Sequence, residues 1–232
     1  MNNYEKLEGM VAATFTPLDE NGDVNLSVID KYADWIASTP IKGVFVCGTT
    51  GEFSSLTIDE RKLILEKWLV SARKRFKVIA HVGSNCQRSA MELARHAAQV
   101  GADAIASIAP SFFKPGTVDE LVDFFAPICH SAAGLPFYYY NMPSITGVNL
   151  PVDKFLVEGK KKIPNLVGTK FTHNNLMEMG VCIELEQHRF EVLHGYDEIL
   201  ISGLAMGAVA GVGSTYNYCL LYTSPSPRDK RQ

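Results

Sequence analysis

The fold of this chain is most constrained by an eightfold alternation of short apolar runs with segments of helical periodicity. The apolar runs, rich in β-branched and aromatic residues, lie at 10–17, 43–49, 77–83, 103–110, 136–141, 165–170, 190–195 and 207–214. Between them, apolar residues recur at helical spacing over 26–38, 58–75, 87–100, 118–133, 151–159, 175–187 and 197–206. Apolar strands that alternate with amphipathic helices predict a parallel sheet covered on both faces.

Eight such units, roughly 25 to 30 residues apart, favour a (β/α)8 barrel, the TIM barrel of the α/β class. An open doubly wound sheet is the alternative, but no GxGxxG turn follows the first strand. Three helical segments open on N-cap residues: Asn25, Thr57 with Glu60, and Thr117 with Glu120.

Composition and charge exclude several functional classes. The 232 residues carry a formal net charge of −3 with no basic stretch before the last few residues, so there is no electrostatic footprint for nucleic acid or an anionic membrane. No apolar run approaches the length of a transmembrane helix. The first ten residues lack the apolar core of a signal peptide, and we therefore expect a cytoplasmic protein.

The cysteines and histidines argue against a disulfide framework and a metal site. Five cysteines lie singly, without a CxxC pair, so we expect reduced thiols. Six histidines are scattered without an HxH or HxxxH pair, so we expect no metal. His81 is interpreted as a hydrogen-bonded residue of the core or rim, and Trp35 and Trp68 as helix-packing residues.

In a (β/α)8 barrel the functional site lies in the loops after the C-terminal ends of the strands. The predicted strands end in small, hydroxyl-bearing and ionisable residues, unlike the apolar residues before them. These ends are Thr16, 48–52, 83–85, 112–113, 140–141, 170–172, 195–198 and 213–215. We expect them to converge on one face of the barrel.

Lys170 ends an apolar strand, where burial of an ammonium group is unfavourable. Burial favours the neutral amine, and a neutral lysine amine is a nucleophile toward carbonyl groups. Tyr140 ends the preceding strand and is expected beside Lys170, where its phenol can transfer protons during carbinolamine formation and carbon–carbon bond cleavage. The pair suggests Schiff-base aldol chemistry, with a solvated surface lysine as the alternative.

A carboxylate site is suggested by the stretch Gly48-Thr49-Thr50-Gly51. The glycines allow a sharp turn and close approach of the backbone, and two hydroxyls with successive N–H groups can hold a carboxylate. A strand-to-helix turn with threonine caps is the alternative. Together with the lysine and the tyrosine, the loop suggests that the ligand is an α-keto acid. The amine would react with its ketone, and the loop would bind its carboxylate.

Five stretches of the chain resemble the dihydrodipicolinate synthase/N-acetylneuraminate lyase family. They are GTTGE at 48–52, YYYNMPSITG at 138–147, GTKFT at 168–172, HGYDE at 194–198 and GVGSTYN at 211–217. They occur in the family's order and spacing, and the resemblance runs from residue 7 to about 218. It implies a class I aldolase without cofactor or metal, because the lysine supplies the electron sink.

The resemblance also implies roles for individual residues. Lys170 forms the Schiff base and Tyr140 transfers protons. Thr49 and Thr50 bind the carboxylate, and Thr49 also hydrogen-bonds the tyrosine. The lyases of the family hold the polyhydroxy tail of a sugar with residues that correspond here to Thr172, Gly195, Asp197, Glu198 and Ser214.

The substrate class follows from one position of the motif after the fifth strand. The synthases of the family carry an arginine there for a second carboxylate, and Ile145 stands in its place. Asp197 and Glu198 would repel a carboxylate and accept hydrogen bonds from sugar hydroxyls. The resemblance therefore implies a homotetrameric lyase that cleaves N-acetylneuraminate (sialic acid) to N-acetylmannosamine and pyruvate. The alternatives are an aldolase for another 2-keto-3-deoxy sugar acid, a dihydrodipicolinate synthase-like enzyme, and an inactive fragment.

Two features depart from the family. Many relatives offer a tyrosine across a subunit interface after the fourth strand, but this chain has Phe112 and Phe113, so we expect no hydroxyl relay there. After Tyr218 the resemblance stops, and we expect the eighth helix and the family's C-terminal helices to be lacking. We expect an incomplete barrel domain at 1–218, with exposed apolar surface near its first and last strands, and a disordered or artefactual tail at 219–232.

Overall fold

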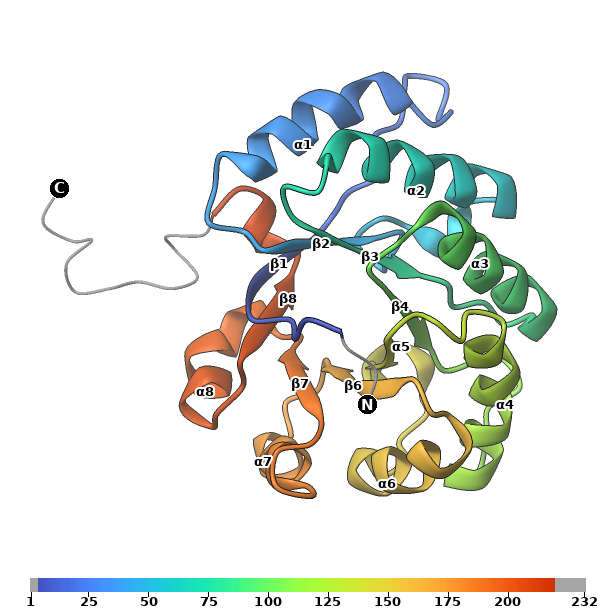
Figure 1. Cartoon of the computed structure of the whole chain (residues 1–232), viewed down its shortest axis with the longest axis vertical. Coiled ribbons are helices and arrows are strands. Elements are labelled where there is room, and N and C mark those ends of the chain that lie inside the picture. The colour runs from blue at the N-terminus through green and yellow to red at the C-terminus, as the bar shows by residue number, and fades with distance from the viewer. Residues whose placement is uncertain (1–3, 220–232) are drawn as a thin grey trace, which may run out of the picture.

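Eight parallel strands form a closed barrel in the computed structural model, which describes residues 4–219 (Figure 1). The pairing follows chain order through β1 (Gly9–Ala13), β2 (Gly43–Val46), β3 (Lys77–His81), β4 (Ala104–Ile108), β5 (Phe137–Asn141), β6 (Leu166–Phe171), β7 (Glu191–His194) and β8 (Ala210–Gly213). Pairing of β8 with β1 closes the ring. The predicted (β/α)8 barrel is confirmed, and the open doubly wound sheet is wrong.

Helices connect successive strands and surround the barrel (Figure 1). They are α1 (Ile29–Ala37), α2 (Ile58–Ala72), α3 (Gln87–Val100), α4 (Val118–His130), α5 (Pro143–Thr146), α6 (Val152–Lys162), α7 (Leu176–Glu184) and α8 (Leu200–Ala205). Within residues 4–219, β8 is followed by a 3-10 turn at Thr215–Asn217 and by no α-helix. Every helix in that range falls short of the length and apolar character needed to span a bilayer. The predicted tail lies, from residue 220 onward, outside the described residues.

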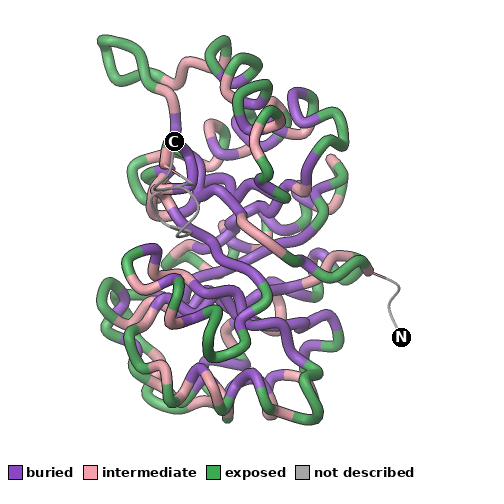
Figure 2. The backbone as a smooth tube through the Cα atoms, turned by 90° about the vertical axis from the view of Figure 1, so that its left-hand side faces the viewer, coloured by how far each residue is buried: buried purple, intermediate pink, exposed green. Residues whose placement is uncertain are grey.

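The strands bury side chains on both faces, as strands of a barrel surrounded by helices must. Side chains that point into the barrel form a small inner cluster, which includes Val11, Phe45, Ile79, Tyr140 and Val212. Side chains on the opposite face pack against the helices in a larger outer cluster, in which Trp68, Phe125 and Phe155 are fully buried. Buried segments accordingly run through the middle of the molecule, and exposed segments lie at its periphery (Figure 2).

A buried carboxylate closes the end of the barrel opposite the strand C-termini. Glu191 begins β7 and accepts hydrogen bonds from Tyr4 Oη at 2.5 Å and Leu7 N at 2.9 Å. It also accepts one from Tyr138 Oη at 2.8 Å. Gly168 stands between Tyr138 and Glu191 in the strand register, and a Cβ there would lie 2.0 Å from Glu191 O. Because Gly168 has no side chain, Glu191 can lie close to β6 and reach Tyr138. The hydrogen bonds from Tyr4 and Leu7 to Glu191 then tie the N-terminal segment across this end of the barrel.

The turn after β8 joins the last unit of the barrel to the first, and we call this junction the seam. Asn217 donates from Nδ2 to Ala13 O at 2.7 Å, and its Oδ1 accepts from Tyr32 Oη at 2.6 Å. Trp35 Nε1 donates to Asn217 O at 2.9 Å. Trp68 packs in the core as predicted, but Trp35 is 54% exposed, so its assignment as a packing residue is wrong. The hydrogen bond to the seam, rather than burial, holds its indole.

Three large side chains near the last strand are exposed. Val209 precedes β8, Tyr218 follows the last turn, and Ile201 lies on α8; all three are exposed. In a complete (β/α)8 barrel an outer ring of helices covers the strands. In the described residues β8 is nevertheless buried throughout, with Leu200 of α8 and Tyr216 of the last turn packed against Gly211.

Candidate active site

Lys170 and Tyr140 project into the mouth of the barrel from neighbouring strands. Tyr140 in β5 and Lys170 in β6 are register partners, so their side chains lie on the same face of the sheet. That face is the barrel interior, because Tyr140 belongs to the inner cluster. Strand pairing therefore brings an amine and a phenol together near the strand C-termini, as the sequence predicts.

The Lys170 amine lies over two aromatic rings. Its Nζ is 4.0 Å from the centroid of the Tyr140 ring and 4.2 Å from that of Phe45, and the residue is 4% exposed. The ring faces hold the nitrogen in place and shield it from water. Phe45 is absent from the predicted site. The two-residue period of β2 turns Phe45 inward, but an apolar residue in an apolar strand gives no sequence signal that it contacts the amine.

The Tyr140 hydroxyl contacts one predicted and one unpredicted residue. Thr49 Oγ1 lies 3.1 Å from Tyr140 Oη, and either oxygen could donate. Tyr140 Oη is also within hydrogen-bonding distance of Met142 Sδ, at 3.1 Å. The contact with Thr49 is the one expected from the sequence. A thioether is a weak acceptor, so Thr49 is the stronger partner of the phenol.

The loop after β2 turns sharply before it reaches Thr49. Cys47 has a φ of 54°, in the left-handed region that few non-glycine residues occupy. Thr16 Oγ1 donates to Gly51 O at 2.7 Å and fixes the far side of the turn. Thr49 and Thr50 are half-buried on this loop. The turn thus places Thr49 against the phenol, with Thr50 beside it in the chain.

Thr172 and Gly195 fit together at the ends of β6 and β7. The buried Thr172 Oγ1 has no hydrogen-bond partner within the described part of the chain. A Cβ at Gly195 would lie 2.0 Å from this oxygen, so a side chain there would displace Thr172. The unpaired hydroxyl leaves a buried polar atom near Lys170 that a ligand could satisfy.

Asp197 links the loop after β7 to the turn after β8. Its Oδ2 accepts hydrogen bonds from Thr215 N and Thr215 Oγ1, both at 2.8 Å. A Cβ at Gly213 would lie 1.9 Å from Asp197 Oδ1, so the carboxylate packs directly on that glycine. Ser214 is half-buried between Gly213 and Thr215, whereas Glu198 is exposed.

The predicted residues therefore form two groups connected by β6. In the first group, Tyr140 contacts both Lys170 and Thr49. In the second, Thr172, two residues after Lys170 in the chain, packs against Gly195. Over residues 4–219, no hydrogen bond joins Thr50, Glu198 or Ser214 to another predicted site residue.

Three residues at which the sequence departs from the expected pattern lie on the surface. Ile145 on α5 is 61% exposed. Phe112 and Phe113 are 77% and 86% exposed, and their rings meet edge to face at 5.0 Å. None of the three offers a hydrogen-bonding side chain to the mouth of the barrel.

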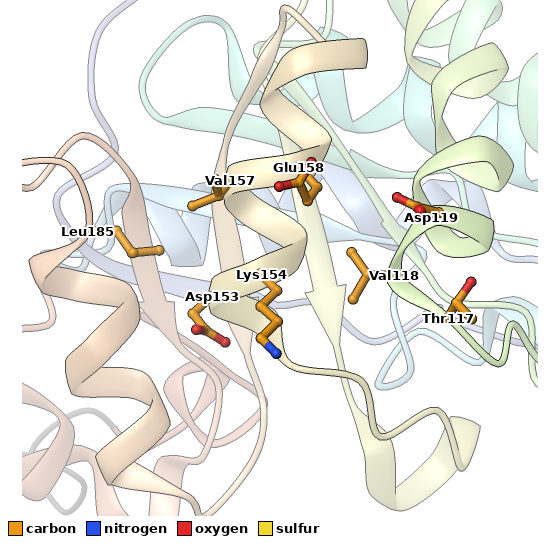
Figure 3. A pocket seen from close by; sticks show the side chains of 8 residues that line it. All are labelled: Thr117, Val118, Asp119, Asp153, Lys154, Val157, Glu158 and Leu185. Atoms are coloured by element: carbon orange, nitrogen blue, oxygen red, sulfur yellow. The ribbon is translucent and has the colours of Figure 1, made fainter.

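A separate hollow of about 430 Å³ lies outside the barrel, between α4 and α6 (Figure 3). Its lining comprises Thr117, Val118, Asp119, Asp153, Lys154, Val157, Glu158 and Leu185. It includes no predicted site residue. Across the described range, no group of three or more His, Cys, Asp or Glu side chains is arranged to hold a metal ion.

The chain matches known proteins over most of its length. The sequence profile of the Dihydrodipicolinate synthetase family matches residues 6–221. The N-acetylneuraminate lyase of Gallus gallus is 47% identical over 221 residues, which cover 94% of this chain and 72% of that protein.

Solved structures of the same kind resemble the fold closely. The N-acetylneuraminate lyase of Proteus mirabilis superposes with a TM-score of 0.90 at 39% identity, covering 92% of this chain and 72% of that one. The N-acetylneuraminate lyase of Aliivibrio salmonicida has a TM-score of 0.90 at 42% identity, with 92% and 71% covered.

Proposed function

This chain belongs to the dihydrodipicolinate synthetase family, and on that premise we propose that it is a class I aldol lyase acting on N-acetylneuraminate. The reaction breaks a carbon–carbon bond and gives N-acetylmannosamine and pyruvate. The observation that carries the proposal is the buried Lys170 amine against Tyr140, whose hydroxyl lies 3.1 Å from Thr49. A homotetramer in the cytoplasm is part of the proposal, and light scattering on the purified chain tests the subunit number.

The first steps convert the substrate ketone into an electron sink. The Lys170 amine attacks C2 of the keto acid, and a carbinolamine forms. Tyr140 gives a proton to the departing hydroxyl, water leaves, and an iminium joins Nζ to C2. Thr49 and Thr50 hold the adjacent carboxylate through hydroxyls and backbone N–H groups, which orients C2 toward the amine.

In the cleavage step Tyr140 acts as a base instead of an acid. The Tyr140 oxygen, having given up its proton, accepts the proton of the C4 hydroxyl as the C3–C4 bond breaks. The electron pair of that bond forms the enamine, with the Lys170 nitrogen as the sink, and N-acetylmannosamine leaves as the aldehyde. Protonation of C3 restores the iminium. Water adds at C2, pyruvate departs and the amine is free again.

The second group of residues is suited to the sugar tail. Thr172, Glu198 and Ser214 offer hydroxyl and carboxylate oxygens at the ends of three neighbouring strands. Asp197 Oδ2 is engaged by Thr215, which orients the carboxylate and leaves Oδ1 as the acceptor for a substrate hydroxyl. Gly195 keeps the approach to the Thr172 hydroxyl open.

The decisive test is covalent trapping of the iminium. Borohydride added with pyruvate should reduce the iminium to a secondary amine, and mass spectrometry of the intact chain and its peptides should place the adduct at Lys170. Lys170→Ala should give no adduct, whereas Lys154→Ala, at an exposed lysine of α6, should be trapped like the wild type. A folded wild-type chain that is not trapped would contradict the proposal.

A substrate panel separates the proposal from its alternatives. N-acetylneuraminate should be cleaved faster than 2-keto-3-deoxygluconate, and the precursors of dihydrodipicolinate should not react, since Ile145 cannot bind a second carboxylate. EDTA should leave the rate unchanged, because the lysine is the electron sink. Preference for the shorter sugar acid would assign the chain to the neighbouring aldolases instead.

A further inference from the structure

A buried chain of hydrogen bonds runs behind the loop that carries Thr49. Arg61 in α2 is 4% exposed; its Nη2 donates to His81 O at 2.7 Å and its Nη1 to Gly83 O at 2.9 Å. The ring Nδ1 of His81 lies 2.8 Å from Cys47 O. A carbonyl oxygen only accepts, so Nδ1 carries the proton and donates it to Cys47. Helix α2, the end of β3 and the end of β2 are thereby joined.

The hydrogen bond from His81 to Cys47 lies where the loop changes direction. Cys47 occupies the left-handed region, which a non-glycine residue keeps only when its surroundings hold it there. The carbonyl that accepts from His81 belongs to the peptide group between Cys47 and Gly48. Fixing that peptide group fixes the direction in which Gly48 and Thr49 leave β2.

The His81 ring also packs against the other parts of the site. Its centroid is 5.7 Å from that of Tyr140, with the rings nearly perpendicular, and 4.5 Å from that of Phe53. Phe53 N donates to Gly48 O at 3.3 Å, and the Arg61 guanidinium lies over the Phe53 ring at 5.4 Å. Burial, together with the positive charge of Arg61, holds the pKa of His81 well below its usual range, so the ring stays neutral. A neutral ring keeps the single proton on Nδ1.

We propose that Arg61 and His81 are positioning residues for the carboxylate of the α-keto acid. Arg61 fixes the end of β3, and His81 fixes the peptide group that aims Thr49 at the carboxylate and at Tyr140. Both act through the loop and neither touches the reacting atoms. This inference rests on the proposed function, because it assumes that the loop binds pyruvate.

The test measures the pyruvate concentration that gives half-maximal borohydride trapping. His81→Asn keeps an N–H close to the position of Nδ1, whereas His81→Gln carries its amide one bond farther from the backbone. The Asn variant should stay near the wild-type value, and the Gln variant should need roughly tenfold more pyruvate. Arg61→Met removes the hydrogen bonds to His81 O and Gly83 O and should raise the half-maximal pyruvate concentration severalfold. This variant provides the test if His81→Gln does not fold.

Leu65→Ala is the matched control, because Leu65 lines the same small cavity as Arg61 and His81 without bonding to the loop. It should lower the melting temperature and leave the half-maximal concentration unchanged. If His81→Gln and Arg61→Met lower the melting temperature but trap pyruvate with the wild-type half-maximal concentration, the two residues are structural and the inference fails. Failure to trap the wild type would instead contradict the proposed function.

Discussion

At the residue scale, Tyr140 serves the site in two ways that substitution can separate. The face of its ring lies against Lys170 Nζ, and its hydroxyl lies beside Thr49 Oγ1. Removing the hydroxyl alone leaves the ring contact, and with it the position of the amine. Without the hydroxyl, bond cleavage should be lost, whereas the iminium should still form, but more slowly, because the ring continues to hold the amine.

Tyr140→Phe should retain covalent trapping by pyruvate at long incubation and lose turnover. Positioned proton transfer contributes about 10²- to 10⁴-fold, so kcat for N-acetylneuraminate should fall by about that factor. Pyruvate release measures the rate, and borohydride trapping measures the iminium. Tyr218→Phe, at an exposed phenol, should behave like the wild type in both assays. Loss of trapping in step with turnover would show that the two functions are not separable.

Sequence reasoning finds the polar part of this site better than its apolar support. Lys170, Tyr140 and Thr49 stand out because polar groups at the ends of apolar strands are unusual, and their contacts are present as expected. Phe45 and Met142 do not stand out, because an aromatic or thioether side chain in an apolar segment is indistinguishable from core. Their importance comes from which atom they touch, and only the register of the strands decides that.

At the element scale, helix starts follow the sequence more closely than helix ends. Thr57 and Thr117 form capping boxes with the glutamates three residues on, and α2 and α4 begin where expected. Helix α2 ends at Ala72, three residues early, because Arg73 and Lys74 have φ values of 48° and 59°. No glycine marks that end, so the sequence carries no signal of it.

Two further differences from the predicted helices have local reasons. Helix α1 begins at Ile29 because Leu26–Val28 forms a 3-10 turn, which shares the helical pattern of apolar residues. Helix α5, with four residues, is too short to show a period and is missing from the predicted elements. The strands that carry Tyr140 and Lys170, β5 and β6, end within about one residue of the predicted runs, whereas β1 and β2 end about four and three residues early.

Gly168→Ala tests how closely β6 and β7 must approach. A Cβ at this position would lie 2.0 Å from Glu191 O, so β6 must move, and the free energy of unfolding should fall by about 3 kcal/mol or more. Urea denaturation measures the loss. Gly134→Ala is the control, because nothing lies within 4 Å of its added carbon, and it should change stability little. A stable Gly168→Ala chain would mean that the strands tolerate a wider spacing.

At the scale of the whole molecule, two fully enclosed histidines make stability depend on pH. His81 lies inside the barrel and His194 lies outside it under α8. Burial, with the charge of Arg61, holds the pKa of His81 well below its usual range. Burial also lowers the pKa of His194. The unfolded chain, by contrast, protonates its histidines near the ordinary pKa of about 6.5.

The free energy of unfolding should therefore be greatest above about pH 6.5 and decrease as the pH falls below it. Below that point the unfolded chain binds protons that the folded chain does not, and each histidine contributes up to about 1.4 kcal/mol per pH unit. Urea denaturation at several values between about pH 7.5 and 5.5 measures the slope. His194→Asn should reduce the slope, and His130→Gln, at an exposed histidine, should not. Stability that is flat or rises toward pH 5.5 would contradict the assignment.

The seam gives this protein a built-in optical reporter. The chain has two tryptophans: Trp68 lies wholly in the core, and Trp35 is half in solvent with its indole N–H bound to Asn217 O. Their fluorescence should differ in emission wavelength and in quenching by a dissolved quencher, because the Trp68 ring is buried and the Trp35 ring is exposed to solvent. If the first and last units of the barrel separate, the hydrogen bond from Trp35 to Asn217 breaks, while the buried Trp68 remains inaccessible to the quencher. A single spectrum can thus distinguish local opening of the ring from loss of the whole fold.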